Sequence, residues 1–401
     1  MKRKLILIML LLLFTIPCLR GQRKEMSQAR SYIKSGKDFD KAEKLMEELL
    51  SKDSLNRMNP KIYLLLYQSV LKQYEAGNEK LYLKQQYDTA SLFDLTKRMF
   101  DIVESLDSVD ALPDKKGKIK LEYRNKHAAE LDAYRPNLYY GGTFNIHKRD
   151  YNKAFSFFDT YLDCGNQPLF SNFNYWKNDS KMQDAAFWAT YCGYKLNNPK
   201  YILKYLDVTM ADTAKHKSTL IYISHAYKLL GEKEKYVSIL SQGFLKYPTV
   251  PYFFSHLFDY YVVANNLDSA LTITDRALKY DGNNPLFLYA KSSVLLNMGN
   301  YDGCIQVGDS LIQINDTLAE VYYNVGTAYL NKGIYFESDK KLRKNREQIR
   351  HYYQQALPYM EKYRELAPTE DRKWGPALYK IYLILNMGKQ FEEIDNYLKD
   401  K

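Results

Sequence analysis

A period of 34 residues runs through the second half of the 401-residue chain and constrains its fold more than any other feature. Four units begin at Lys217, Pro251, Pro285 and Ala319 and follow one another without gaps. Apolar residues recur at positions 4 and 11 of each unit: Leu220, Phe254, Leu288 and Tyr322, then Tyr227, Tyr261, Leu295 and Tyr329. Positions 4, 7, 8 and 11 share one face of a helix with 3.6 residues per turn. The period therefore predicts stacked helical units, each with an apolar face that its neighbours bury.

Position 15 of each unit holds a residue type that is common at the ends of helices. It is Gly231, Asn265, Gly299 and Gly333 in turn. Glycine and asparagine tolerate the left-handed backbone found at helix C-termini. Each unit is therefore predicted to be two antiparallel helices with a turn at position 15.

One unit carries the clearest motif. Its residues are Tyr322, Val325, Gly326, Tyr329, Gly333 and Tyr335, followed by Ala356, Met360, Tyr363 and Pro368. In these residues the chain resembles the tetratricopeptide-repeat family, provided that 18 extra residues, 336–353, are allowed as an insertion. The resemblance implies an all-α fold, a right-handed α-solenoid of antiparallel helix pairs. It also implies a protein that holds a partner and is not an enzyme. The whole sequence is similar to exported tetratricopeptide proteins of the Bacteroides type.

The predicted domain organisation follows this pattern along the chain. Residues 1–21 are predicted to be a signal peptide, 22–133 a helical region with degenerate repeats, and 134–401 the solenoid. The best repeats are 217–250, 251–284, 285–318 and 319–370, with capping helices over 371–401. In the N-terminal region, residues 61–74 and 78–106 are predicted to be two long amphipathic helices.

The N-terminus has the features of an export signal. Lys2, Arg3 and Lys4 precede an apolar run, 5–14, that is too short to span a membrane. We expect cleavage between Gly21 and Gln22, which places the mature chain in the periplasm or the cell envelope. Cys18 raises a lipoprotein alternative, which the proline directly before it disfavours.

Charge and cysteines limit the classes of partner and cofactor. The formal charge of +11 falls to +7 without residues 1–21, which is modest for this length and does not indicate nucleic-acid binding. We expect a protein or peptide partner, no small-molecule substrate, and at most peripheral contact with the membrane or envelope. Cys164, Cys192 and Cys304 show no metal-binding spacing, so no metal site is expected. They could form one disulfide or remain buried thiols.

A search for catalytic motifs finds one literal match, Gly308-Asp309-Ser310-Leu311, which spells the nucleophile motif of the GDSL hydrolases. That chemistry needs the serine on a turn after a strand and a downstream Asp-x-x-His pair. The motif falls inside a predicted helix, and no Asp-x-x-His occurs in the chain. We therefore expect no catalytic residues and no cofactor.

The resemblance also indicates where a partner would bind. In the family, positions 2, 5, 9, 12 and 13 of each first helix line a concave groove. Carried onto this chain, the groove residues include Phe187, Tyr191, Lys195, His225, Asp259, Tyr289, Asn297, Tyr323 and Asn331. Such an aromatic strip with polar neighbours suits an extended peptide or a helix, and aromatic rings could also hold sugar rings. Alternatively, part of the strip is buried between neighbouring repeats.

The insertion is a second candidate surface. Its basic residues are Lys340, Lys341, Arg343, Lys344, Arg346 and Arg350. They could dock an acidic partner or an anionic headgroup, or form a solvated face. Together these features predict a non-catalytic protein–protein interaction scaffold of the bacterial cell envelope. The alternative is a glycan- or peptide-binding module of an envelope nutrient-capture system.

Overall fold

The computed structural model describes residues 22–114 and 116–399. These residues form helices, and no strand occurs among them, which confirms the predicted all-α class. The predicted signal peptide, including Cys18, lies outside the described residues. The chain divides into two compact units, and the division falls between Gly231 and Glu232.

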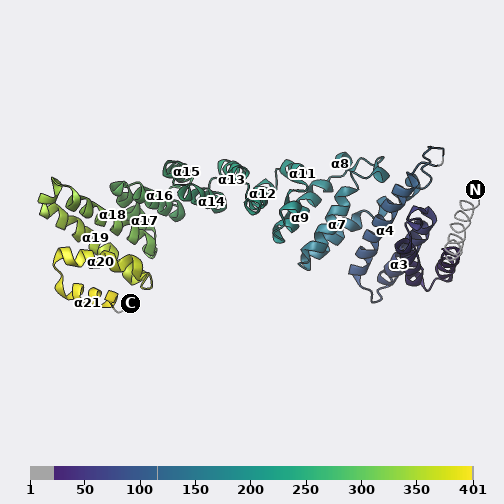
Figure 1. The fold of residues 1–401 in the computed structure, drawn as a ribbon, viewed down its shortest axis with the longest axis horizontal. Helices are drawn as coiled ribbons and strands as arrows, with labels where there is room; N and C mark the ends of the chain where they lie inside the picture. The colour runs from purple at the N-terminus through teal and green to yellow at the C-terminus, as the bar shows by residue number, and fades with distance from the viewer. Residues whose placement is uncertain (1–21, 115, 400–401) are drawn as a thin grey trace, which may run out of the picture. The chain divides into compact units, whose positions relative to one another are not determined.

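The first unit is a succession of helices, and most of its longer helices pack on helices that are close to them along the chain. Residues 22–35 are helical. The helices that follow are α2 (Phe39–Lys52), α3 (Pro60–Tyr82), α4 (Thr89–Asp110), α5 (Arg124–Tyr134), α6 (Pro136–His147), α7 (Tyr151–Asp163), α8 (Tyr175–Asn178), α9 (Lys181–Lys195), α10 (Pro199–Leu203), α11 (Leu206–Ala211) and α12 (His216–Leu230). Two 3-10 turns, η1 (Asn56–Met58) and η2 (Pro168–Phe170), lie between them. Figure 1 shows α3, α4, α7 and α9 following one another in this unit.

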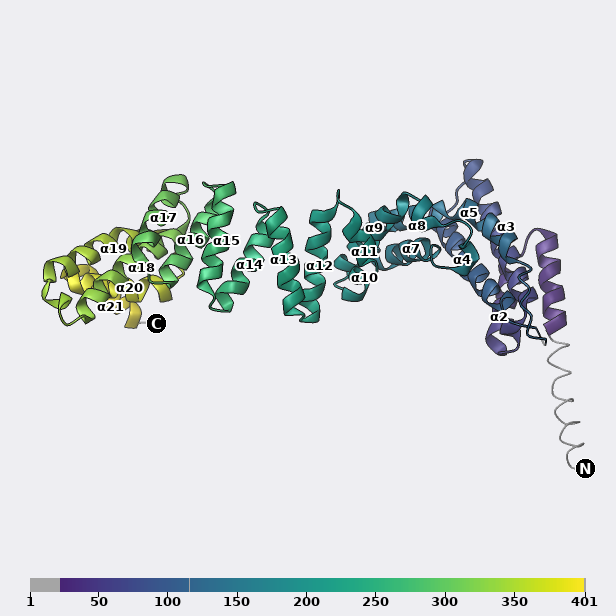
Figure 2. The ribbon, with the colours of Figure 1, turned by 90° about the horizontal axis from the view of Figure 1, so that it is seen from above.

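The second unit has the same construction. Its helices are α13 (Lys233–Lys246), α14 (Pro251–Val263), α15 (Leu267–Tyr280), α16 (Pro285–Asn297), α17 (Tyr301–Ile314), α18 (Ala319–Ser338), α19 (Arg346–Leu366), α20 (Asp371–Leu385) and α21 (Gly388–Lys399), with the 3-10 turn η3 (Leu342–Lys344) before α19. Figure 2 shows α13 to α16 side by side in chain order. Consecutive packed helices in each unit give the α-solenoid construction that the 34-residue period predicts.

Asparagine and proline start several of these helices. Asn59, Asn198 and Asn284 each precede a proline at the first helical position, and each side chain accepts a hydrogen bond from a backbone N–H two residues later, at 3.0–3.1 Å. An asparagine N-cap satisfies an otherwise free amide, and proline there loses no helical hydrogen bond. The sequence thus sets these helix starts locally.

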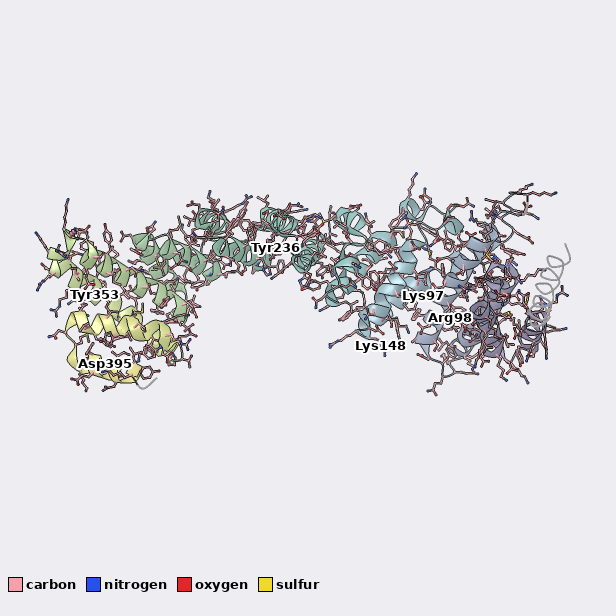
Figure 3. The ribbon with its side chains drawn as sticks, viewed as in Figure 1. Lys97, Arg98, Lys148, Tyr236, Tyr353 and Asp395 are labelled. Atoms are coloured by element: carbon pink, nitrogen blue, oxygen red, sulfur yellow. The ribbon has the colours of Figure 1, made fainter. Side chains whose placement is uncertain are left out.

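Left-handed residues end helices at the spacing that the sequence predicts. Gly231, Asn265 and Gly299 have φ of 71°, 54° and 75°, and Asn197, one period earlier, has φ of 51°. The prediction is wrong at Gly333, which lies inside α18. There α18 runs on to Ser338, and the missing side chain of Gly333 leaves room for the ring of Tyr353 on α19, labelled in Figure 3.

The predicted helix over residues 78–106 is also wrong in extent. The chain breaks between the end of α3 at Tyr82 and the start of α4 at Thr89. Lys84 has φ of 58° in this break, and the Asp88 side chain caps α4 by accepting from the amide of Ala90 at 3.0 Å. A left-handed turn followed by an N-cap ends one helix and begins the next.

Arg135 joins four elements of the first unit. Its guanidinium lies between the rings of Tyr161 and Tyr175, 3.8 and 3.7 Å from their centroids. It also donates to Asp179 at 2.6 Å and to the backbone carbonyl of Tyr161 at 3.1 Å. Because Arg135 itself is buried, these contacts replace part of the water that a charged group would otherwise need, although its Nε has no hydrogen-bond partner among the described residues. They fix the start of α6 against α7, α8 and the start of α9.

The three cysteines of the described chain, Cys164, Cys192 and Cys304, are buried free thiols. Burial raises the pKa of Cys192 to about 12 and that of Cys304 above its usual value. Among the described helices, none combines the length and the apolar character that crossing a membrane requires.

Candidate interaction surfaces

The predicted groove residues of the first unit lie among half-buried aromatic side chains on α9 and α12. We call Trp188, Tyr191, Tyr194, Tyr222 and His225 the α9/α12 aromatic surface. The ring centroids of Trp188 and Tyr191 are 5.6 Å apart, and those of Tyr191 and Tyr222 are 5.9 Å apart. The rings of Tyr194 and Tyr222 stack at 4.6 Å, and His225 meets Tyr194 edge-on at 5.1 Å. Neighbouring rings thus hold one another in place while all five remain partly exposed.

Asp184 makes a polar edge beside this surface. Its carboxylate accepts hydrogen bonds from the Tyr139 hydroxyl and from Trp188 Nε1, the latter at 3.1 Å, and it pairs with Lys215 Nζ. Burial raises the pKa of Asp184, but the hydrogen bonds from Lys215 and Tyr139 outweigh it and hold the pKa below its usual value. The carboxylate therefore stays ionised near neutral pH and fixes the orientation of the Trp188 ring.

The structure gives the four predicted residues of the first unit different environments. Tyr191 and His225 belong to the α9/α12 aromatic surface, and the exposed Lys195 places its Nζ 5.6 Å from the Tyr191 ring centroid. The His225 ring lies 2.8 Å from the Asn197 side-chain oxygen. Burial, then the nearby Lys228, lowers the pKa of His225.

Phe187, by contrast, is only 7% exposed. Its ring packs against Trp188 and Tyr222, and Lys215 Nζ lies 4.8 Å from its centroid. Phe187 therefore follows the alternative that part of the strip is buried between neighbouring repeats, because this ring fills the contact between α9 and α12, and a role of Phe187 in binding stays a prediction.

Sequence reasoning missed Trp188, Tyr194 and Tyr222 as members of this surface. Tyr194 occupies position 12 of a repeat that begins at residue 183, and position 12 is one that the family turns toward its groove. Trp188 and Tyr222 are one period apart, both at position 6. The repeated aromatic at that position was the available signal.

In the second unit, Tyr289 on α16 and Tyr323 on α18 occupy the same repeat position. Both are half-buried, and their helices pack on each other. The Tyr323 ring lies 5.1 Å from the buried ring of Tyr363, and Lys373 Nζ lies 5.8 Å from the Tyr323 centroid. Burial raises the pKa of Tyr289, with a smaller contribution from Glu320.

The remaining predicted groove residues of this unit differ in their exposure to solvent. Asp259, on α14, and Asn297, at the end of α16, are exposed, whereas Asn331 in α18 is half-buried. Binding by any of these residues stays a prediction.

The basic insertion forms a compact turn between two long helices. Asp339 accepts hydrogen bonds from the amides of Lys341 and Leu342 at 2.8 and 2.9 Å, which closes the turn after α18. Asn345 caps α19 by accepting from the amide of Gln348 at 3.0 Å. Lys340, Lys341 and Lys344 are exposed in this turn, as are Arg343, Arg346 and Arg350 near its α19 side. The basic side chains are therefore displayed on an ordered scaffold.

Other hollows and motifs carry little chemistry. A hollow of about 720 Å³ between α2, α3 and α4 is lined by apolar residues, such as Leu66 and Ile102, and by charged residues, of which Glu47 and Arg98 pair with each other. Arg98, labelled with Lys97 in Figure 3, contacts Glu43 at 2.6 Å and Glu47, and Lys97 contacts Asp101 at 2.9 Å. Within residues 22–114 and 116–399, no group of three or more metal-ligating side chains is found.

The hydrolase-like motif lies in the middle of α17. Ser310 Oγ donates to the backbone carbonyl of Gln306 at 3.0 Å, and the Asp309 carboxylate accepts from the Tyr359 hydroxyl at 2.8 Å. The serine is thus on a regular helix and not on the strand-to-helix turn that the hydrolase chemistry requires.

Comparisons with known proteins find similarity only among solved structures. No protein-family model and no curated protein matches the chain. The C-terminal part of a TPR repeat-containing protein from Cytophaga hutchinsonii is 13% identical, covers 64% of this chain and 92% of its own, and has a TM-score of 0.44. YrrB, described as a TPR protein with an unusual peptide-binding site, is 15% identical, with 48% and 90% coverage and a TM-score of 0.36. MamA from Desulfovibrio magneticus RS-1 is 19% identical, with 48% and 99% coverage and a TM-score of 0.35.

At these identities and scores, no residue or binding role carries over from those proteins to this chain. The class rests instead on the chain's own helix pairs, with left-handed turn residues at 34-residue intervals from Asn197 to Gly299. They define a helical-repeat protein. In its sequence motif, the repeat resembles that of the tetratricopeptide family.

Proposed function

We propose that this protein is a non-catalytic interaction scaffold that holds a segment of a protein partner on the first helices of its repeats. The observation that carries the proposal is the α9/α12 aromatic surface. Its rings are held by one another and by the Asp184 network before any partner arrives. A preorganised aromatic surface gives contact area without the entropy cost of ordering side chains on binding.

An extended peptide suits this surface best. Tyr and Trp combine an apolar face with a polar tip, so they can cover a partner's apolar side chains and also hydrogen-bond its backbone. Lys195 and His225 add polar groups at the edge of the same rings. The pair Tyr289 and Tyr323 offers a smaller surface of the same kind in the second unit.

A variant pair with a matched control tests the proposal. Tyr191→Ala with Tyr194→Ala removes two partly exposed rings, and we expect recovery of the native partner to fall by at least about tenfold. Tyr82→Ala, at a tyrosine that is 86% exposed near the end of α3, should leave recovery unchanged. Circular dichroism spectra should match the wild type in both cases, and recovery is compared at a temperature well below every unfolding midpoint, because the two lost rings also pack on Trp188 and Tyr222. Undiminished recovery with the double variant would contradict the proposal.

We also propose that the scaffold works in the bacterial cell envelope. Support comes from Lys2, Arg3 and Lys4, followed by the short apolar run 5–14. Mass analysis of the protein from its native envelope should find a mature chain that begins near Gln22. An intact Met1, or a lipidated start at Cys18, would contradict this location.

The alternative is a glycan- or peptide-binding module of an envelope nutrient-capture system, and its glycan form is considered because partly exposed tyrosine rings also stack on sugars. Competition binding with oligosaccharides distinguishes the scaffold function from the glycan-binding function. Oligosaccharides that displace the partner, or bind directly and lose affinity in the Tyr191→Ala and Tyr194→Ala variant, would favour the glycan function.

A further inference from the structure

A hollow of about 470 Å³ opens in the second unit where the basic turn meets α20. Its lining is Glu337, Arg343, Arg346, Ile349, Arg350 and Ile384. These residues come from the end of α18, from η3, from the first turns of α19 and from the last turn of α20. The hollow is therefore made by the insertion together with the repeat that follows it.

The positive charge of the hollow is not neutralised within the described part of the chain. None of Arg343, Arg346 and Arg350 forms an ion pair there, and Arg350 makes only a long hydrogen bond of 3.4 Å to the carbonyl of Leu385. The carboxylate in the lining, Glu337, is already engaged. Its Oε2 accepts from the Tyr353 hydroxyl at 2.9 Å and lies 2.9 Å from Lys380 Nζ.

Three guanidinium groups around one concavity select for oxoanions. A guanidinium presents paired N–H donors whose spacing matches a carboxylate or a phosphate. Without a ligand these charges repel one another, so an anion would relieve an unfavourable interaction as well as form new hydrogen bonds. The charge and the donor type of this lining therefore suit an oxoanion.

The rest of the lining favours a peptide over a bare phosphate or a lipid surface. Ile349 and Ile384 give the hollow an apolar part that suits an aliphatic side chain. Both contacts of Glu337 with Tyr353 and Lys380 use Oε2, so Oε1 can accept a hydrogen bond from a peptide N–H group. The exposed lysines that a flat anionic membrane would contact, Lys340 and Lys341, do not line the hollow.

We propose that this hollow binds an acidic segment of the protein partner, with carboxylates on Arg343, Arg346 and Arg350 and an apolar side chain on Ile349 and Ile384. The inference rests on the proposed scaffold function and names the chemistry of one part of the partner. It concerns the insertion and not the first-helix surfaces.

The test uses the full mature chain and a fluorescein-labelled peptide in which glutamate alternates with leucine, followed by fluorescence anisotropy. Arg346→Gln with Arg350→Gln should weaken binding at least about tenfold. The matched control, Lys340→Gln with Lys344→Gln, removes the same charge from the same turn and should weaken binding less than about threefold. Arg346→Lys with Arg350→Lys keeps the charge but removes the paired donors, and it should resemble the glutamine variant.

Three outcomes would overturn the inference. Equal losses from the arginine and lysine variants would mean diffuse charge attraction and not a site. Full binding by the lysine replacements of Arg346 and Arg350 would mean that no guanidinium geometry is used. Binding of phosphatidylglycerol vesicles that the same arginine variant abolishes, without peptide binding, would assign the surface to a membrane.

Recovery of the native partner by the same variants distinguishes failure of this inference from failure of the proposed scaffold function. If the arginine variant still recovers the native partner fully while Tyr191→Ala with Tyr194→Ala does not, the inference about the hollow fails and the proposed function stands. If neither variant loses the partner, the proposed function fails as well.

Discussion

Replacing Gly193 by alanine should show whether the cost of disturbing close helix packing exceeds the gain in helix propensity. Gly193 lies in α9, and a Cβ there would fall 2.6 Å from the backbone nitrogen of Ile202 and 2.8 Å from the backbone carbon of Tyr201 in α10. Ordinary contacts begin near 3.4 Å, so α10 must move by several tenths of an ångström. Because the obstacle is backbone, no change of rotamer relieves it.

The expected magnitude follows from two opposing terms. Alanine in place of glycine inside a helix stabilises it by about 0.5–1 kcal/mol. Overpacking costs about 1–3 kcal/mol, and a backbone obstacle places the cost in the upper part of this range. We expect the variant to lose about 1–2 kcal/mol of stability, with the loss concentrated in α9 and α10, since each repeat contacts only its neighbours.

Gly326→Ala is the matched control. A Cβ at Gly326 would meet Met360 at 3.0 Å from Cγ and 3.1 Å from Cε, and a methionine side chain can swing aside. Hydrogen exchange should show faster opening of residues 181–203 in Gly193→Ala and little change in Gly326→Ala, and urea unfolding should rank the two in the same order. A Gly193→Ala protein as stable as the wild type, or a larger loss in Gly326→Ala, would refute this reasoning.

Three further predictions concern charged groups of the first unit. Arg135→Ala should cost about 3–5 kcal/mol in urea unfolding, because it removes a buried charge from between two rings and leaves Asp179 without its ion-pair partner; a loss under about 1 kcal/mol would contradict this. Burial, with repulsion from Asp163, raises the pKa of Glu104 to about 7. Ionisation of Glu104 therefore opposes folding as pH rises above about 4.5. Glu104→Gln should raise the thermal unfolding midpoint at pH 8 and leave it nearly unchanged at pH 4.5. Burial raises the pKa of Asp179, but hydrogen bonds from Tyr161 and Arg135 bring it below 3.8, so its stabilising effect is present above about pH 4 and lost below; an Asp179→Asn protein should show a shallower fall in stability under acid than the wild type.

The sequence predicted the parts of this fold that depend on local chemistry and on repetition. Gly231, Asn265 and Gly299 end helices because their backbone can adopt positive φ, and this property belongs to the residue type. The 34-residue spacing of these positive-φ residues extends upstream to Asn197, which lies one period before Gly231. These features need no knowledge of neighbouring helices.

The features that the sequence could not give depend on which residues meet in space. Gly333 looks like a helix end in the repeat pattern, yet the insertion continues α18 past it and turns it into a close contact with Tyr353. Phe187 occupies a family groove position, but it is buried because Trp188 and Tyr222 meet it from α9 and α12. The hollow between the basic turn and Ile384 needs residues from separate repeats, so no local pattern could indicate it.

The central claim is that a partner lies on the α9/α12 aromatic surface. Site-specific photocrosslinking in the native envelope tests it most directly, with p-benzoylphenylalanine placed at Tyr191 in one variant and at Tyr82 in another. The account predicts that light produces one discrete adduct from position 191, with the same partner identified by mass spectrometry in repeated preparations, and none from position 82. Adducts of equal yield from both positions, or from position 82 alone, would contradict it.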